Sequence, residues 1–168
     1  SVLPKSIRIV ESSEVPDSFH AQKQAISKLY EYRILNRGSA SALDKAVYFY
    51  PHKIDWEQVH KALPHFIGEH DFSAFQGAKA SVLSTVRRIL RFDLVSAPGG
   101  IHTFQVEGNG FLKQMVRTMV GTLIEVGENK RKPQDIPQII ESRDRNQAGR
   151  TAPPEGLCLV RICYPPLT

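Results

Sequence analysis

Arg117 is the residue of this sequence whose type and position most clearly suggest chemistry. It lies within residues 108–127, where apolar residues recur three and four apart, which predicts a helix of about four turns with a broad buried face. Arginine keeps its charge, and an unpaired charge at the edge of a core is costly. We therefore expect a carboxylate or phosphate partner; the alternative is a guanidinium that reaches past the helix to water. Gly121, one turn further on, predicts a close approach by another group.

Basic residues form four clusters in the second half of the chain. A single cluster is most often a solvated surface, but four of them together with aromatic residues favour a polynucleotide partner. The clusters are Arg87, Arg88 and Arg91; Lys113 and Arg117; Lys130, Arg131 and Lys132; and Arg143, Arg145 and Arg150.

Tyr30 and Tyr32 alternate along a segment that is expected to be a strand, residues 28–36. Two interpretations remain open for this pair. The rings are either ordinary sheet aromatics or a platform on which an unpaired base stacks.

Several other kinds of chemistry are disfavoured. His60, His65 and His70 are five apart, so they do not share a helical face, and no cysteine or carboxylate cluster joins them. The sequence lacks a phosphate-binding G-x-x-x-x-G-K-[ST] run, a complete dinucleotide fingerprint and a G-x-S-x-G elbow. We expect neither a metal site nor a nucleotide cofactor, and a serine hydrolase is unsupported.

The elements that would position these residues are hairpin-forming strands mixed with a few helices. Residues 98–100 read as a tight turn between two strands, residues 68–77 as a loop, and Asp55 as a helix N-cap. This order predicts one α+β domain, an antiparallel sheet with helices packed mainly on one face. Strands are expected over 28–36, 46–50, 85–97, 101–107 and 157–164, and further helices over 56–67 and 133–143.

Length and composition agree with a single globular domain. The 168 residues carry 22 Lys and Arg against 17 Asp and Glu, a net charge of +5 that favours a polyanionic partner. Cys158 and Cys163 are five apart in an expected strand, so they point to opposite faces and predict two buried free thiols in a reducing compartment. No run approaches the ~18 apolar residues of a membrane span. We expect a soluble, intracellular protein of the cytosol, the nucleus or an organelle.

Seven motifs, in chain order, resemble the C-terminal part of the TruA-type tRNA pseudouridine synthases. Together they extend over essentially the whole chain, and the two longest make a chance similarity very unlikely. They are F-H-A at 19–21, K-x-Y-x-Y at 28–32, Y-P at 50–51, G-x-H-D-F-S-x-F at 68–75, G-N-G-F-L-x-x-M-V-R-x-M-V-G-T-L-x-E-V-G at 108–127, D-R-x-x-A-G-x-T-A-P-x-x-G-L at 144–157 and Y-P at 164–165.

The resemblance implies half of a pseudouridine synthase fold, an activity without metal or nucleotide cofactor, tRNA as substrate, and a homodimer. In that family an aspartate attacks the target uridine, the N-glycosidic bond breaks, the uracil turns, and C5 rejoins the ribose. Arg117 matches the arginine that pairs with the aspartate, Tyr30 the base-stacking tyrosine, and Leu157 the apolar wall of the uracil pocket. The further substrate contacts that we expect are Phe72, Lys113, Lys130 and Arg131.

One departure from the family pattern matters. The R-T-D-x-G-V-type motif that carries the aspartate does not occur in this sequence, and Gly149-Arg150-Thr151 is followed by Ala152. We therefore expect residues 1–168 to be a C-terminal domain that is inactive alone, with residues 1–18 an extended entry segment from a preceding N-terminal half. The alternative is a non-catalytic module for RNA binding or dimerisation.

Overall fold

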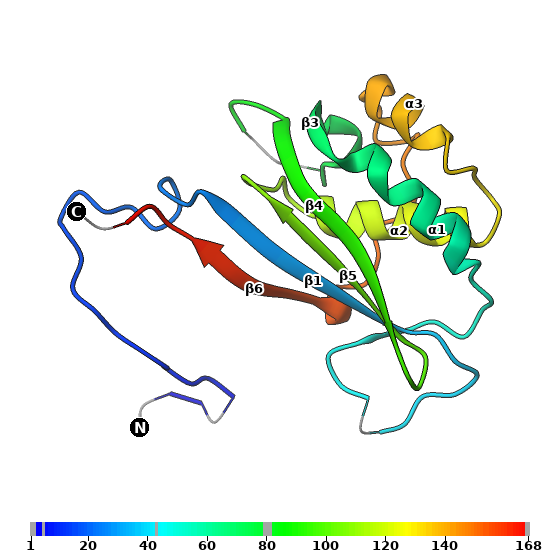
Figure 1. The fold of residues 1–168 in the computed structure, drawn as a ribbon, viewed down its shortest axis with the longest axis horizontal. Helices are drawn as coiled ribbons and strands as arrows, with labels where there is room; N and C mark the ends of the chain where they lie inside the picture. The colour runs from blue at the N-terminus through cyan, green and yellow to red at the C-terminus, as the bar shows by residue number, and fades with distance from the viewer. Residues whose placement is uncertain (1–2, 5, 43, 79–81, 167–168) are drawn as a thin grey trace.

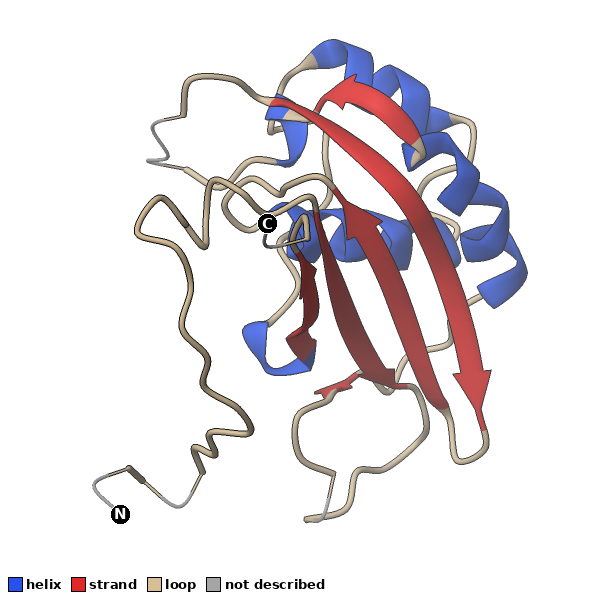
Figure 2. Cartoon of the chain, turned by 60° about the vertical axis from the view of Figure 1, so that its left-hand side comes forward, coloured by secondary structure: helices blue, strands red, loops and turns tan. Residues whose placement is uncertain are grey.

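The structure is a computed structural model that describes residues 3–4, 6–42, 44–78 and 82–166. Within these residues, strands form one six-stranded sheet with the order β2-β1-β5-β4-β3, and β6 pairs with β1. The three α-helices pack on one face of this sheet (Figure 2). The predicted α+β class with helices mainly on one face is confirmed.

The predicted hairpin forms the centre of the sheet. β4 (Val86–Ala97) and β5 (Ile101–Gly108) pair antiparallel around a turn in which Gly99 and Gly100 have φ angles of 83° and 80°. β1 (Ser27–Leu35) lies antiparallel to β5 from Lys28 to Leu35 and is also antiparallel to β6 (Leu157–Cys163). β1 therefore connects the hairpin to the C-terminal strand.

Two strand assignments from the sequence need correction. Residues 68–77 were expected to be a loop, but β3 (Gly68–Asp71) pairs antiparallel with β4. This strand is polar and short, so backbone hydrogen bonding along the edge of the sheet, rather than apolar alternation, defines it. β2 (Tyr48–Phe49) is shorter than the predicted 46–50 and runs parallel to β1.

The helices follow the sequence signals closely. Asp55 caps α1 (Trp56–Ala62) by accepting hydrogen bonds from two backbone N–H groups, and a 3-10 turn with Pro64 follows the helix. Proline lacks the N–H that a regular helix requires, which explains the change of helix type. α2 (Met115–Gly127) is buried on nearly every side, and α3 (Asp135–Ser142) is buried along one face.

The core lies between the sheet and the helices. Phenylalanine and tyrosine rings from the strands meet methionine and branched aliphatic side chains from α2. The largest fully buried side chains are Tyr32, Phe66, Phe72, Phe75, Phe104, Ile34, Leu35, Ile89, Met115, Met119, Leu123 and Ile124.

The cysteines are free, as predicted, but they are not buried. Cys158 is exposed and Cys163 is half-buried. The expectation of two buried thiols is wrong because β6 lies at the edge of the sheet, where the helix layer leaves its outward face uncovered. Among the described residues, none of the helices is long and apolar enough to cross a membrane.

The chain before β1 has little regular structure. Residues 6–17 are exposed, and Figure 1 shows this segment running away from the helix layer. It joins the body where the Phe19 ring contacts the Tyr164 ring edge-on at 5.1 Å and the Ile26 N–H donates to the Cys163 carbonyl.

Candidate active site

Arg117 lies half-buried near the start of α2, and its side chain is held by the backbone of a neighbouring loop. Its Nε donates to the Ala152 carbonyl at 2.6 Å, and the Ala152 N–H donates to the Arg117 carbonyl at 3.0 Å. This arrangement fixes the direction of the guanidinium without neutralising its charge. Within the described residues, the terminal amino groups of Arg117 have no hydrogen-bond or ion-pair partner.

The loop that holds Arg117 runs along α2 and is tied to it by two threonines. Thr122 Oγ1 accepts the Gly149 N–H at 2.9 Å, and Thr118 Oγ1 lies 3.3 Å from Thr151 Oγ1. Between these contacts a Cβ at Gly121 would overlap the Arg150 carbonyl oxygen. The close approach that Gly121 predicted is therefore confirmed, and the approaching group is this loop.

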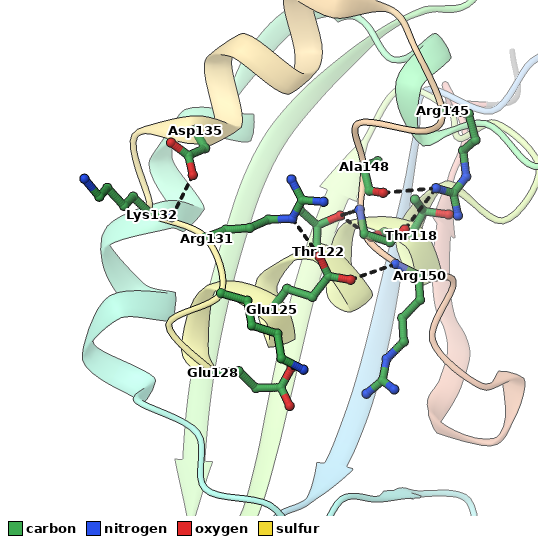
Figure 3. Close-up of polar contacts among 12 residues, drawn as sticks. Thr118, Thr122, Glu125, Glu128, Arg131, Lys132, Asp135, Arg145, Ala148 and Arg150 are labelled. Atoms are coloured by element: carbon green, nitrogen blue, oxygen red, sulfur yellow. Dashed lines mark hydrogen bonds and ion pairs between the residues drawn. The ribbon is translucent and has the colours of Figure 1, made fainter.

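Glu125 and Arg145 complete the anchoring of the loop (Figure 3). Glu125 accepts from Arg131 Nε at 2.6 Å and from the Arg150 N–H at 3.1 Å. Arg145 donates to the Gly149 carbonyl at 2.9 Å and to Thr151 Oγ1 at 3.0 Å. Sequence reasoning placed Arg145 only in a basic cluster and missed Glu125. Thr118 and Thr122, spaced i, i+4 around Gly121, are the sequence pattern that indicates a helix face against which a backbone segment packs.

Tyr32, on β1, is hydrogen-bonded to the loop that holds Arg117. Its hydroxyl donates to the Pro153 carbonyl at 2.6 Å, and its ring is fully buried. Burial raises the pKa of Tyr32, and the nearby positive charge of Arg117 offsets only part of that rise, so the phenol stays neutral. Leu157 is the direct partner of Tyr32 on β6, and paired residues on antiparallel strands share a face. Arg117, Tyr32 and Leu157 thus converge on the helix side of the sheet.

Tyr30 lies two residues before Tyr32 on β1 and therefore on the same face. Its half-buried ring meets Phe111 edge-to-face, with ring centroids 5.1 Å apart. Burial raises the pKa of Tyr30, so its phenol is also neutral near pH 7. We call Arg117, Tyr30, Tyr32 and Leu157 the Arg117 cluster.

The other residues that we expect to contact the substrate differ in their exposure and in their partners. Phe72 is fully buried and packs edge-on against Phe75 with centroids 6.1 Å apart, so its ring lies in the core of the described chain. Lys113 is exposed and donates to the Ala78 carbonyl at 3.1 Å. Lys130 is 64% exposed and pairs with Glu128 at 2.9 Å. Arg131 is only 26% exposed because it is committed to Glu125.

The basic clusters also separate in space. Arg91 lies on the sheet face away from the helices and pairs with Asp93 at 3.0 Å, whereas Arg143 pairs with Asp71 at 3.3 Å. Arg91 and Arg143 are therefore each paired with a local carboxylate, on different elements of the fold. Among the described residues, no group of three or more histidine, cysteine, aspartate and glutamate side chains is arranged to hold a metal ion.

Tyr50 and Glu128 form a hydrogen-bonded pair whose effect on stability depends on pH. Burial and the hydrogen bond to Glu128 raise the pKa of Tyr50 to about 12. A raised pKa in the folded state stabilises the fold below the unfolded value, near 10, and that contribution is lost as pH rises through about 12. We expect the free energy of unfolding to fall across this interval, and to fall less in Tyr50→Phe. Urea denaturation at stepped alkaline pH checks this, and an identical fall in both proteins would contradict it.

The chain is similar in sequence to proteins of known name. The sequence model of a family described as tRNA pseudouridine synthase matches residues 62–165. The tRNA pseudouridine synthase A of Acetivibrio thermocellus is 47% identical over 164 residues, which are 97% of this chain and 67% of that protein. The tRNA pseudouridine synthase A of Clostridium acetobutylicum is 42% identical over 165 residues, 98% of this chain and 67% of that protein. This chain therefore spans about two thirds of the length of these relatives.

Proposed function

This chain belongs to the tRNA pseudouridine synthase family, and from that premise we propose that it supplies the cationic and apolar walls of a pocket in which a uridine of tRNA becomes pseudouridine. The isomerisation exchanges the N-glycosidic bond for a bond between C5 and the ribose, with no net change of composition. The protein's task is then to extract the base, hold it and stabilise charge.

The observation that carries the proposal is the state of the Arg117 guanidinium. One N–H is bonded to the Ala152 carbonyl, so the side chain is already oriented, while the terminal amino groups have no partner in the described part of the chain. Two parallel N–H donors fit a carboxylate well. We propose that this carboxylate is a catalytic aspartate supplied by polypeptide outside these 168 residues, and that the 168 residues alone are inactive.

Tyr30 and Leu157 have the chemistry that the remainder of the pocket requires. A uridine must leave its stack before its glycosidic bond is accessible, and a flipped base needs an aromatic or apolar surface to replace the lost stacking. Both side chains are half-buried and pack on the core, so each is held in place and still has accessible surface. The neutral Tyr30 phenol adds no charge that would compete with the proposed ion pair.

The test is formation of pseudouridine by the intact protein. Unmodified tRNA transcripts are incubated with the protein, digested, and their nucleosides separated by chromatography. We expect pseudouridine from the intact protein and none from residues 1–168 alone. Absence of product on every tRNA, with a folded protein, would overturn the proposal. Tight tRNA binding without product would instead favour an RNA-binding module.

A homodimer is a further part of the proposal. Leu159 and Val160 on the edge strand β6 are 43% and 49% exposed, and Ile26, next to Cys163 at the end of the same strand, is 56% exposed. Apolar side chains on an open strand edge favour contact with another strand. Light scattering of the intact protein during size-exclusion chromatography is expected to give twice the mass of one chain, and the monomer mass would exclude the dimer.

Lys130→Ala in the intact protein is expected to weaken tRNA binding and flatten its salt dependence. Lys130 is exposed, and loss of one phosphate contact reduces the slope of log Kd against log salt by about 0.9 on a duplex. Lys61→Ala is the matched control, because Lys61 is 52% exposed and pairs with Glu57 at 2.7 Å on α1. Equal slopes in both variants would remove Lys130 from the tRNA contact surface. Arg131 is less suitable for this test because it is only 26% exposed and Glu125, its partner, also holds the Arg150 N–H.

A further inference from the structure

We propose that Arg150 and the hollow beside it form a second nucleotide subsite, which holds the nucleotide adjoining the target uridine. This inference rests on the proposed function, because its ligand is the RNA strand that enters the Arg117 cluster. The hollow has a volume of about 470 Å³. We call it the aromatic hollow, and it is lined chiefly by Tyr48, Tyr50, His52, Glu128, Lys130 and Arg150.

Arg150 gives the aromatic hollow its preference for an anion. Its guanidinium carbon lies 5.5 Å from the centroid of the Tyr50 ring, and within the described residues it has no ion-pair partner. Among the described residues, Glu128 is the one carboxylate that lines the hollow, and it is paired with Lys130 at 2.9 Å and hydrogen-bonded by the Tyr50 hydroxyl. Burial of Glu128 would raise its pKa, but the hydrogen bonds from Tyr50 and Lys130, together with the positive charges of Lys130 and Arg150, lower it and keep the carboxylate ionised. Lys130 and Arg150 together carry one more charge than Glu128 balances. A backbone phosphate would balance the remaining positive charge.

A row of rings gives the same hollow a surface for a base. Tyr48 lies 6.5 Å from Tyr32 and 5.6 Å from Tyr50, and Tyr50 lies 5.3 Å from His52, centroid to centroid. Tyr50 is buried, whereas Tyr48 is half-buried and His52 is exposed. Accessible ring surface in the hollow is therefore supplied by Tyr48 and His52. Exposed rings beside an unpaired cation are the combination that binds single-stranded RNA through stacking and phosphate contact.

The aromatic hollow is continuous with the proposed active site. The row of rings begins at Tyr32, which is paired with Leu157 and lies next to Arg117. Arg150 precedes Ala152 by two residues, and Ala152 is the residue that holds the Arg117 guanidinium. A strand with its target base at the Arg117 cluster would thus place the adjoining phosphate near Arg150 and the adjoining base on Tyr48 or His52.

Arg150 also lines a second hollow of about 470 Å³, together with Gln114, Arg145 and Thr151. It therefore borders both hollows. Arg145 is committed to the Gly149 carbonyl and the Thr151 hydroxyl, whereas Arg150 has no ion-pair partner among the described residues. A phosphate contact at Arg150 would guide the strand from one hollow to the other.

The first test compares Arg150→Ala with Arg91→Ala in the intact protein. Arg91 is 48% exposed, but it lies on the opposite face of the sheet and is paired with Asp93. We expect Arg150→Ala to weaken tRNA binding about tenfold at low salt and to reduce the salt slope by about 0.7, the value for one single-strand phosphate. The single-turnover rate at saturating tRNA should stay within about threefold of the unaltered protein, because Arg150 does not touch the reacting atoms.

The second test pairs ring variants with single abasic sites in the tRNA on either side of the modified uridine. Tyr48→Leu is expected to weaken binding about fivefold or more by removing a stacking surface, and Tyr48→Phe to preserve binding. The loss should disappear when one particular neighbouring nucleotide is abasic, because no base remains to stack. His52→Ala repeats the test at an exposed ring, in case Tyr48→Leu destabilises the fold.

These measurements separate the subsite from the proposed function. The subsite alone would be overturned if the protein forms pseudouridine but two results fail. In the first, Arg150→Ala and Arg91→Ala have equal slopes of log Kd against log salt. In the second, the affinity lost through an abasic site simply adds to the affinity lost through the ring variant. Absence of pseudouridine from the unaltered, folded protein would overturn both. A reduced slope together with a neighbour-specific loss of the ring effect establishes the subsite.

Discussion

Arg117→Ala in the intact protein is expected to lower single-turnover pseudouridine formation by about 10²–10³-fold, while the Kd for tRNA changes by about threefold or less. The side chain is oriented by Ala152 and offers its terminal amino groups to a partner that forms or stabilises the reacting complex. An interaction made mainly in the transition state lowers the rate more than it lowers affinity. A phosphate contact would lower both together.

The controls for Arg117 address geometry and folding. Arg117→Lys keeps the charge but loses the planar pair of donors, so we expect it to recover only part of the rate. Thermal melting of each variant is needed because substitution also leaves the Ala152 carbonyl without its Nε donor. Equal losses of rate and tRNA affinity in a folded Arg117→Ala protein would contradict a catalytic carboxylate as the partner of Arg117.

Gly121→Ala is expected to destabilise the fold by about 3 kcal/mol or more and to remove activity with it. In an isolated helix the same change is favourable by about 1 kcal/mol, since alanine is the better helix former. In this protein the added methyl group would overlap the Arg150 carbonyl, which is backbone and cannot rotate away. The loop would have to leave α2, and Arg117 would lose its Ala152 contact.

Whether Gly121→Ala raises or lowers the free energy of unfolding therefore tests the contact between α2 and the loop. Gly38→Ala is the matched control, because a Cβ at position 38 meets nothing within 4 Å. Urea denaturation should show a large loss of stability for Gly121→Ala and little change for Gly38→Ala. A Gly121→Ala protein as stable as the parent would mean that the loop does not pack against α2 as described.

The parts of the fold predicted from sequence are those with a strong local cause. Pro98-Gly99-Gly100 allows only a tight turn between alternating segments, Asp55 caps a helix, and Gly121 lies in an otherwise bulky helix. The turn and the cap depend on backbone geometry within a few residues, whereas Gly121 predicts a close approach without identifying the approaching segment. The structure therefore matches them closely.

The parts that were not predicted depend on contacts between distant segments. β3 is polar and forms because β4 offers it an edge, and Phe72, which follows β3, lies in the core. The role of Glu125 depends on two partners, Arg131 and Arg150, that reach it from a following loop. No local pattern in the sequence predicts such contacts between distant segments.

The central claim is that Arg117 pairs with a catalytic carboxylate from beyond residues 1–168. An experimental structure of the intact protein tests it most directly, through the distances between the Arg117 terminal nitrogens and the nearest aspartate carboxylate. We predict separations of about 3 Å, with both terminal nitrogens facing the carboxylate. A guanidinium that contacts only Ala152 and solvent, with every carboxylate more than about 6 Å away, would contradict the claim.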